Sequence, residues 1–208
     1  MHILSALRYG DKNCTIVLGQ YKSYKKEKKV RRGSRTPTFA ALRAHLDLAE
    51  WYEVPIYLRT GKRLDHRHTY IVVEFEKPLL KRHEAIEPNK LIIELAPEEK
   101  IQIHLVDPAG KVMRGHRSVV SAESLACVGE DCLPEHAKLI LDAALGDHTN
   151  FVSFEEIIAS WQFIDRVIKR IEKDNIRVHE YADKSKGPDA QHELTACDGF
   201  KWYDADNL

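Results

Sequence analysis

The stretch that decides the fold runs Tyr57-Leu58-Arg59-Thr60-Gly61-Lys62-Arg63-Leu64. Its pattern predicts the end of a buried strand that leads into a glycine turn with cationic side chains at its tip. Because Gly61 has no Cβ, we expect the turn to adopt a positive φ there and to let a ligand approach the backbone. Arg67 follows a few residues later. Cations fixed on a strand end are typical of a site for an anion or a sugar, although a solvated turn has the same residue types.

Segments rich in β-branched and apolar residues flank this stretch on both sides. They predict strands at residues 13–19, 54–58, 70–75, 90–95, 100–105 and 117–125. Pro97-Glu98-Glu99 separates two of these strands, so an antiparallel hairpin is the simplest connection there. Residues 38–51 fit the period of a helix and that of a strand about equally well.

Two helices are predicted after the strands. The first covers residues 134–145 and ends at Gly146. The second begins after Ser153, a residue type suited to the N-cap, and its apolar residues recur at helical spacing and predict a buried face. These residues are Ile157, Ile158, Trp161, Ile164, Val167, Ile168 and Ile171. The tail over residues 177–208 is polar and contains the turn signal Gly187-Pro188, so irregular structure is expected.

The order of strands first and helices after predicts an α+β fold. We expect a large mixed, mainly antiparallel sheet with helices packed on one face, in a single domain over residues 1–208. A broad sheet covered on one face leaves its other face apolar, and a partner normally buries such a surface. The sequence therefore predicts a homodimer.

Charge and composition exclude several classes of function. Lys plus Arg and Asp plus Glu are each 32, so the net charge is zero and no field draws nucleic acid to the whole protein. The basic stretch at residues 22–35 has the pattern of a nucleic-acid patch. A solvated loop is the favoured interpretation, because Gly33, Ser34 and Pro37 interrupt it and few aromatic residues accompany it. No apolar run reaches the roughly 20 residues of a membrane span.

Histidines and cysteines give no sign of a metal site. His66 and His68 have a metal-like spacing but no evident carboxylate or thiol partner, so we expect no bound metal. The cysteines are Cys14, Cys127, Cys132 and Cys197. None forms a CxxC pair, and reduced thiols in a cytoplasmic protein are expected, although Cys127 and Cys132 are close enough in sequence to bridge. Glycine fingerprints for dinucleotides, Walker loops and GxSxG elbows are all missing from the sequence.

Two blocks of the sequence are especially specific, Val17-Leu18-Gly19-Gln20-Tyr21 and Arg59-Thr60-Gly61-Lys62. In these blocks the chain resembles the C-terminal domain of glucose-6-phosphate dehydrogenase. Further matching blocks are residues 36–42, 54–64, 88–91 and 141–147, with Trp161, Tyr181, Ser185, Gly187-Pro188, Asp198-Gly199 and Trp202. They follow the order of the family and cover most of the chain.

This resemblance implies a sugar-phosphate site and an NADP-dependent oxidation of glucose 6-phosphate. It places Lys62 and Arg67 at the substrate glucose 6-phosphate. The NADP of the reaction belongs mainly to an N-terminal domain, and neither its glycine fingerprint nor the family's histidine base is found here. We therefore expect no catalytic residue in this chain, and no activity from it alone.

The resemblance also implies a second, structural NADP in some members of the family. Arg59, Lys186 and Trp202 stand at positions that resemble part of that site. Other positions of that site hold His68, Pro88, Gln102 and His104, and a proline offers no donor, so we expect only weak binding. Two alternatives stay open. The chain could be a non-catalytic module for sugar-phosphate binding or dimerisation, or it could be part of the related lumenal hexose-6-phosphate dehydrogenase.

Overall fold

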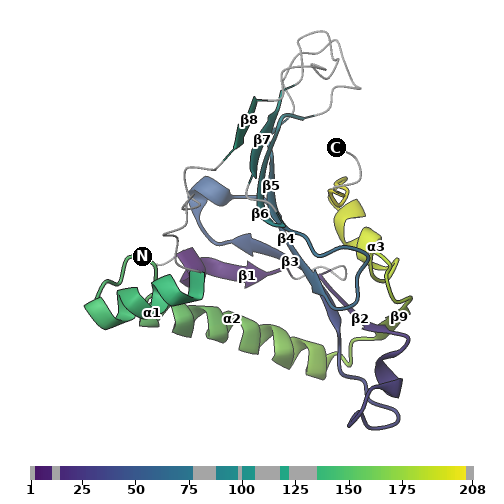
Figure 1. Cartoon of the computed structure of the whole chain (residues 1–208). Coiled ribbons are helices and arrows are strands. Elements are labelled where there is room, and N and C mark those ends of the chain that lie inside the picture. Colours follow the sequence, from purple (N-terminus) through teal and green to yellow (C-terminus); the bar gives the residue numbers. More distant parts are fainter. Residues whose placement is uncertain are drawn as a thin grey trace, which may run out of the picture. The chain divides into compact units, whose positions relative to one another are not determined.

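The computed structural model describes residues 3–10, 15–76, 88–97, 100–105, 118–121 and 135–204. The chain divides into two compact units, of which the first holds Met1–His66 and Phe151–Leu208 and the second holds Arg67–Asn150. Where the sequence suggests a single domain and one broad sheet, each unit has a sheet of its own (Figure 1). The α+β class and the mainly antiparallel pairing of the strands are confirmed.

The first unit is built on a five-stranded sheet. Its strands are β1 (Leu7–Tyr9), β2 (Ile16–Tyr21), β3 (Phe39–Leu46), β4 (Ile56–Gly61) and β9 (Val178–Tyr181). β3 lies at the centre, with β1 and β2 antiparallel along one edge and β4 antiparallel along the other. Residues 38–51, which fit a helix or a strand, therefore form β3 and then a short 3-10 helix, η3 (Ala49–Trp51).

Part of the C-terminal tail completes this sheet. The prediction that residues 177–208 are irregular is wrong where the chain forms β9, which pairs in parallel with β2, and the helix α3 (Gln191–Ala196). Four residues are too few to show a strand period, and β9 is stabilised by partners far away in the sequence. Leu194 of α3 packs on the face of β3 that carries Phe39 and Ala41.

The long helix α2 (Phe154–Lys173) packs on the opposite face of β3 (Figure 1). Ser153 and Glu156 form a capping box, so the predicted N-cap is confirmed. Phe163 and Val167 contact Leu42 and Ala44 of β3.

The buried stripe predicted for this helix is only partly correct. Trp161 is 61% exposed, whereas Ala159 and Phe163, which were not part of that prediction, are buried. Its members Ile157, Ile158, Ile164 and Ile168 are also exposed, at 40–43%.

The second unit holds a four-stranded antiparallel sheet and one helix. Its strands are β5 (Thr69–Glu74), β6 (Lys90–Ala96), β7 (Lys100–His104) and β8 (Ser118–Ser121), and its helix is α1 (Glu135–Leu145). The predicted antiparallel pairing of the strands on either side of Pro97 is confirmed as β6 with β7. Short 3-10 helices in the first unit are η1 (Ile3–Ala6) and η2 (Tyr24–Lys26). Cys127 and Cys132, which are close enough in sequence to bridge, lie outside the described residues.

Candidate functional site

The candidate substrate turn begins where β4 ends. Gly61 is the last residue that pairs with β3, opposite Phe39, and Arg63 then adopts φ 54°. The prediction of a positive φ at Gly61 is wrong, because Gly61 is not among the residues with that conformation. Its lack of a side chain is instead required by packing, since a Cβ at Gly61 would lie 2.7 Å from Phe39 Cδ2.

Hydrogen bonds hold the backbone of this turn in place. The Lys62 N–H donates to the Thr38 carbonyl at 2.8 Å, and the Tyr181 hydroxyl donates to the Lys62 carbonyl at 2.7 Å. Pairing with β3 ends at Gly61, and Leu64 then forms a parallel bridge with Ser185.

The side chains of the turn differ in whether they form ion pairs with other side chains. Arg63 pairs with Glu27 at 2.7 Å and lies 5.4 Å from the centre of the Tyr21 ring. Lys62 is exposed and forms no ion pair with any described residue. Among the described residues, Arg63 of this turn has an ion-pair partner and Lys62 has none. Arg67 is also exposed and belongs to the second unit.

Arg59, Lys186 and Trp202 lie together in the first unit. The Arg59 guanidinium stacks 4.7 Å from the centre of the Trp202 ring. Asp204 joins the two cations, with Oδ1 3.3 Å from Arg59 Nη2 and Oδ2 3.3 Å from Lys186 Nζ. Arg59 also donates to Gln191 Oε1 at 3.0 Å. No pattern in the sequence indicates that Asp204 faces this cluster.

A second charged cluster joins the C-terminal segment to the sheet. Arg43 donates to both oxygens of Asp198, from Nε at 2.5 Å and from Nη2 at 3.1 Å, and the Tyr57 hydroxyl donates to Asp198 Oδ2. Burial and then the hydrogen bond to Asp198 raise the pKa of Tyr57, and the same carboxylate raises the pKa of Arg43. The cluster has a structural role. It links the C-terminal segment to the sheet, and its guanidinium and carboxylate are paired with each other.

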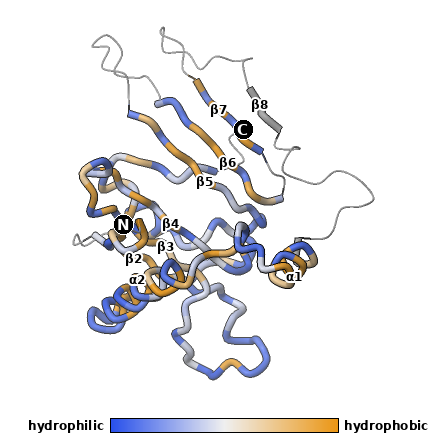
Figure 2. Tube along the Cα trace, turned by 90° about the vertical axis from the view of Figure 1, so that its left-hand side faces the viewer, coloured by the Kyte–Doolittle hydropathy of each residue, from blue (hydrophilic) through white to orange (hydrophobic). Residues whose placement is uncertain are grey.

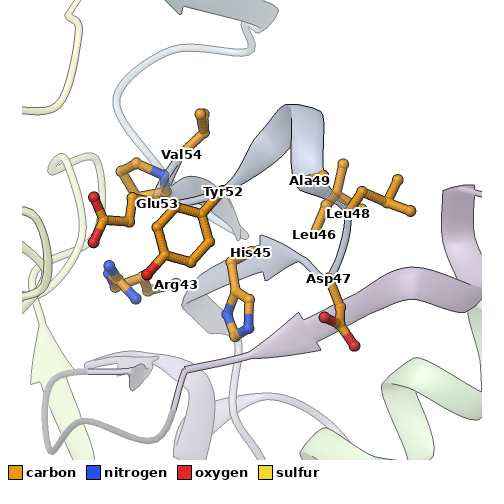
Figure 3. Close-up of a pocket in the computed structure, with 10 residues that line it drawn as sticks. Arg43, His45, Leu46, Asp47, Leu48, Ala49, Tyr52, Glu53 and Val54 are labelled. Carbon is orange, nitrogen blue, oxygen red and sulfur yellow. The ribbon is translucent and has the colours of Figure 1, made fainter.

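A groove lies beside this cluster, over the connection from β3 to β4 (Figure 3). Its volume is about 460 Å³. The lining residues are Arg43, His45, Leu46, Asp47, Leu48, Ala49, Tyr52, Glu53, Val54 and Pro55. None of the site residues that the sequence predicts lines the groove, so it has no part in the predicted sugar-phosphate site.

The sheet of the second unit carries one apolar face. Ile71 lies opposite Ile93, which lies opposite Ile101, so these cross-strand partners share a face. In the same way Val73, Leu91 and Ile103 form a second row across the strands, and β5 and β6 show this apolar character in Figure 2. Ile71 is 51% exposed and Ile103 is 38% exposed, so side chains of this face are partly exposed. The opposite face carries the buried residues Ile92 and Gln102.

Neither a metal site nor a membrane span is found among the residues that the structure describes. These residues contain no group of three or more His, Cys, Asp or Glu that could hold a metal ion. His66 lies 3.4 Å from Asp65 in the first unit, and His68 lies 3.7 Å from Glu94 in the second. In the same described ranges, no helix combines the length and the apolar character needed to cross a membrane.

Comparison with known proteins gives a consistent result. The family model described as "Glucose-6-phosphate dehydrogenase, C-terminal domain" matches residues 1–203. The chain is 37% identical over 181 residues to a glucose-6-phosphate 1-dehydrogenase of Zymomonas mobilis, covering 82% of the chain and 37% of that protein. It is 33% identical over 189 residues to the Bacillus subtilis enzyme, covering 87% of the chain and 38% of that protein.

Solved structures agree with these matches. A glucose-6-phosphate dehydrogenase in complex with its substrate glucose-6-phosphate superposes with a TM-score of 0.78 at 27% identity, covering 97% of this chain and 44% of that chain. The Mycobacterium avium enzyme gives a TM-score of 0.73 at 25% identity, over 97% of this chain and 42% of that one. The chain thus spans about two fifths of the length of its relatives. Its fold, the match over residues 1–203 and these relatives together show that the chain belongs to the glucose-6-phosphate dehydrogenase C-terminal domain family.

Proposed function

We propose that this chain supplies the sugar-phosphate-binding part of an NADP-dependent glucose-6-phosphate dehydrogenase, which oxidises glucose 6-phosphate to 6-phosphogluconolactone. The observation that carries the proposal is the turn after β4, in which the backbone of Lys62 is hydrogen-bonded on both sides while its side chain is exposed. Because the backbone at Lys62 is already fixed, binding of a phosphate or hydroxyl oxygen there costs little further backbone entropy.

Lys62 has the main role in this proposal. Its ammonium carries three donors for the oxygens of the sugar phosphate, and Arg67 is proposed as a second basic contact. The hydride acceptor for this oxidation would be supplied by NADP. We propose that the cofactor is held mainly by the part of the relatives that has no counterpart in this chain, and that the chain by itself does not catalyse the oxidation.

The candidate site for the structural NADP is the cluster of Arg59, Lys186, Trp202 and Asp204. Two cations and an indole ring suit a phosphate and a flat base, so the donor set of Arg59, Lys186 and Trp202 fits the group. However, Asp204 already accepts contacts from both cations. We therefore propose that NADP binds weakly at this cluster, because its phosphate must displace an internal carboxylate.

The apolar face of the second sheet supports a homodimer. Six aliphatic side chains in two rows across β5, β6 and β7 form this face, and Ile71, Val73 and Ile103 are exposed there. Exposed apolar patches of this kind on one sheet face usually mark an interface with another subunit. We propose that a second copy of the chain covers it.

Substitution of Lys62 tests the sugar-phosphate site directly. Lys62→Ala removes a charge-assisted contact of about 1.5–3 kcal/mol, so the Kd for glucose 6-phosphate should rise roughly ten- to a hundredfold. Titration calorimetry on the purified chain measures this Kd, with unphosphorylated glucose as a comparison ligand. Lys25→Ala, which removes another exposed lysine of the same unit, should leave the Kd unchanged. Equal affinities of wild type and Lys62→Ala would exclude Lys62 from the site.

A further inference from the structure

The position of Lys62 depends on a residue that lies far away in the sequence. The Tyr181 hydroxyl donates to the Lys62 carbonyl oxygen at 2.7 Å, and its own oxygen lies 3.0 Å from Thr38 Oγ1. The Lys62 N–H donates to the Thr38 carbonyl at 2.8 Å. Both backbone polar groups of Lys62 are therefore bound, one by Thr38, directly before β3, and the other by Tyr181 on β9.

Tyr181 itself is held firmly by packing. Its side chain is only 3% exposed, and its ring makes edge-to-face contacts with Phe39 and Tyr21 at centroid distances of 5.9 and 6.3 Å. Burial raises the pKa of Tyr181, so its hydroxyl keeps its proton and remains a donor. A buried donor with this little freedom fixes the carbonyl that it binds.

The residues after Tyr181 hold the next part of the turn. The Lys184 N–H donates to the Arg63 carbonyl at 2.8 Å, and the Asp65 N–H donates to the Ser185 carbonyl at 3.1 Å. Arg63 has φ 54°, a conformation that costs energy for a residue with a side chain and persists only where its surroundings enforce it. Hydrogen bonds with the segment 181–185 thus hold the backbone of the turn at 62–65.

We propose that Tyr181 is a positioning residue for Lys62, acting through the Lys62 carbonyl and not by touching the ligand. This inference rests on the proposed function, because it concerns how Lys62 meets the sugar phosphate. It assigns a role to the C-terminal segment. β9 places the Tyr181 hydroxyl against the Lys62 carbonyl, and this contact sets the direction of the Lys62 side chain.

A double-mutant cycle separates this role from a general structural one. Tyr181→Phe keeps the ring in the core and removes only the hydroxyl. It should raise the Kd for glucose 6-phosphate roughly three- to tenfold, the loss expected for one hydrogen bond. In a Lys62→Ala background the same substitution should have almost no effect, because the group that it positions is gone. Tyr24→Phe is the matched control, since Tyr24 packs against the same cluster without a contact to Lys62.

Hydrogen exchange supplies an independent readout. In Tyr181→Phe, the amide of Lys62 should exchange faster, while the β3 amides that pair with β2 keep their protection. An unchanged Kd in the folded Tyr181→Phe protein, or an equal loss in both backgrounds of the cycle, would overturn the inference alone. If wild type did not bind glucose 6-phosphate, the proposed function would fail and this inference with it.

Discussion

The carboxylate of Asp204 neutralises part of the positive charge of Arg59 and Lys186. The side chains of Arg59 and Asp204 are 19% and 23% exposed, so water screens their interaction only in part. Lys186 is more exposed, at 44%. In the proposed weak binding of NADP, a phosphate would have to compete with the Asp204 carboxylate for Arg59 and Lys186.

Replacing Asp204 should strengthen NADP binding at this cluster. Asp204→Asn keeps the size of the side chain and removes the charge that neutralises Arg59 and Lys186, so the Kd for NADP should fall about tenfold. NAD lacks the additional phosphate and should gain less. Calorimetry on the purified chain gives both values, and Asp189→Asn, at an exposed carboxylate of the same segment, is the control. Identical NADP affinities in wild type and Asp204→Asn would refute internal competition.

Individual residues also show what a sequence can predict of a site. The family resemblance groups Arg59, Lys186 and Trp202, and they do lie together. The reason for Gly61 was not predictable, because it depends on Phe39, a residue of another strand that lies within 2.7 Å of where a Cβ would stand. Asp204 was missed for a similar reason: a lone acidic residue in a tail carries no pattern.

Among the larger elements, the residues after α3 contact the sheet partly through the cluster around Asp198. Asp198 follows α3, and its two partners Arg43 and Tyr57 stand on β3 and β4. The Tyr57 ring also contacts Trp202 at a centroid distance of 5.9 Å. The side chains of Arg43 and Asp198 are only 13% and 15% exposed, so loss of either partner would leave a largely buried charge without its counter-ion.

This attachment should make the protein sensitive to alkali. The pKa of Tyr57 is raised in the folded state, so the unfolded chain ionises first, near pH 10, while the folded chain keeps its proton. The stabilisation is thus complete below about pH 10 and is lost as the pH rises towards the folded pKa. Urea unfolding between about pH 9 and 11 should show no loss of stability from Tyr57 below about pH 10 and, above it, a steeper loss in wild type than in Tyr57→Phe. Tyr52→Phe, at a residue that is 76% exposed, should follow wild type. Parallel curves for wild type and Tyr57→Phe would argue against this role of Tyr57.

The strands and helices differ in how well the sequence predicts them. The strands from β4 to β7 and the helix α2 carry strong periods and end signals, and they form close to the expected residues. β9 and α3 have four and six residues, too few for a period, and they form because β2 and β3 offer them partners. The bridge between Leu64 and Ser185, just after β4, is also a long-range contact that local patterns do not encode.

For the whole molecule, the main question is what covers the apolar face of the second sheet. In the proposed dimer this face is buried, and the strand register places Ile71 and Ile93 in one row and Val73 and Leu91 in the next. A charge in either row would have to be desolvated on association, which costs far more than a charge elsewhere on the surface.

Ile71→Lys should therefore convert a dimer to a monomer, because the new ammonium has no partner among the apolar side chains of a second copy. Sedimentation velocity over a range of concentrations should show wild type as a dimer and Ile71→Lys as a monomer at the same concentrations. Ile140→Lys is the matched control: Ile140 is 72% exposed and belongs to α1 of the same unit, not to the sheet, and the variant should remain dimeric. A wild type that stays monomeric at high concentration would disprove the homodimer. Dissociation of both lysine variants would instead show that the interface is not specific to the sheet face.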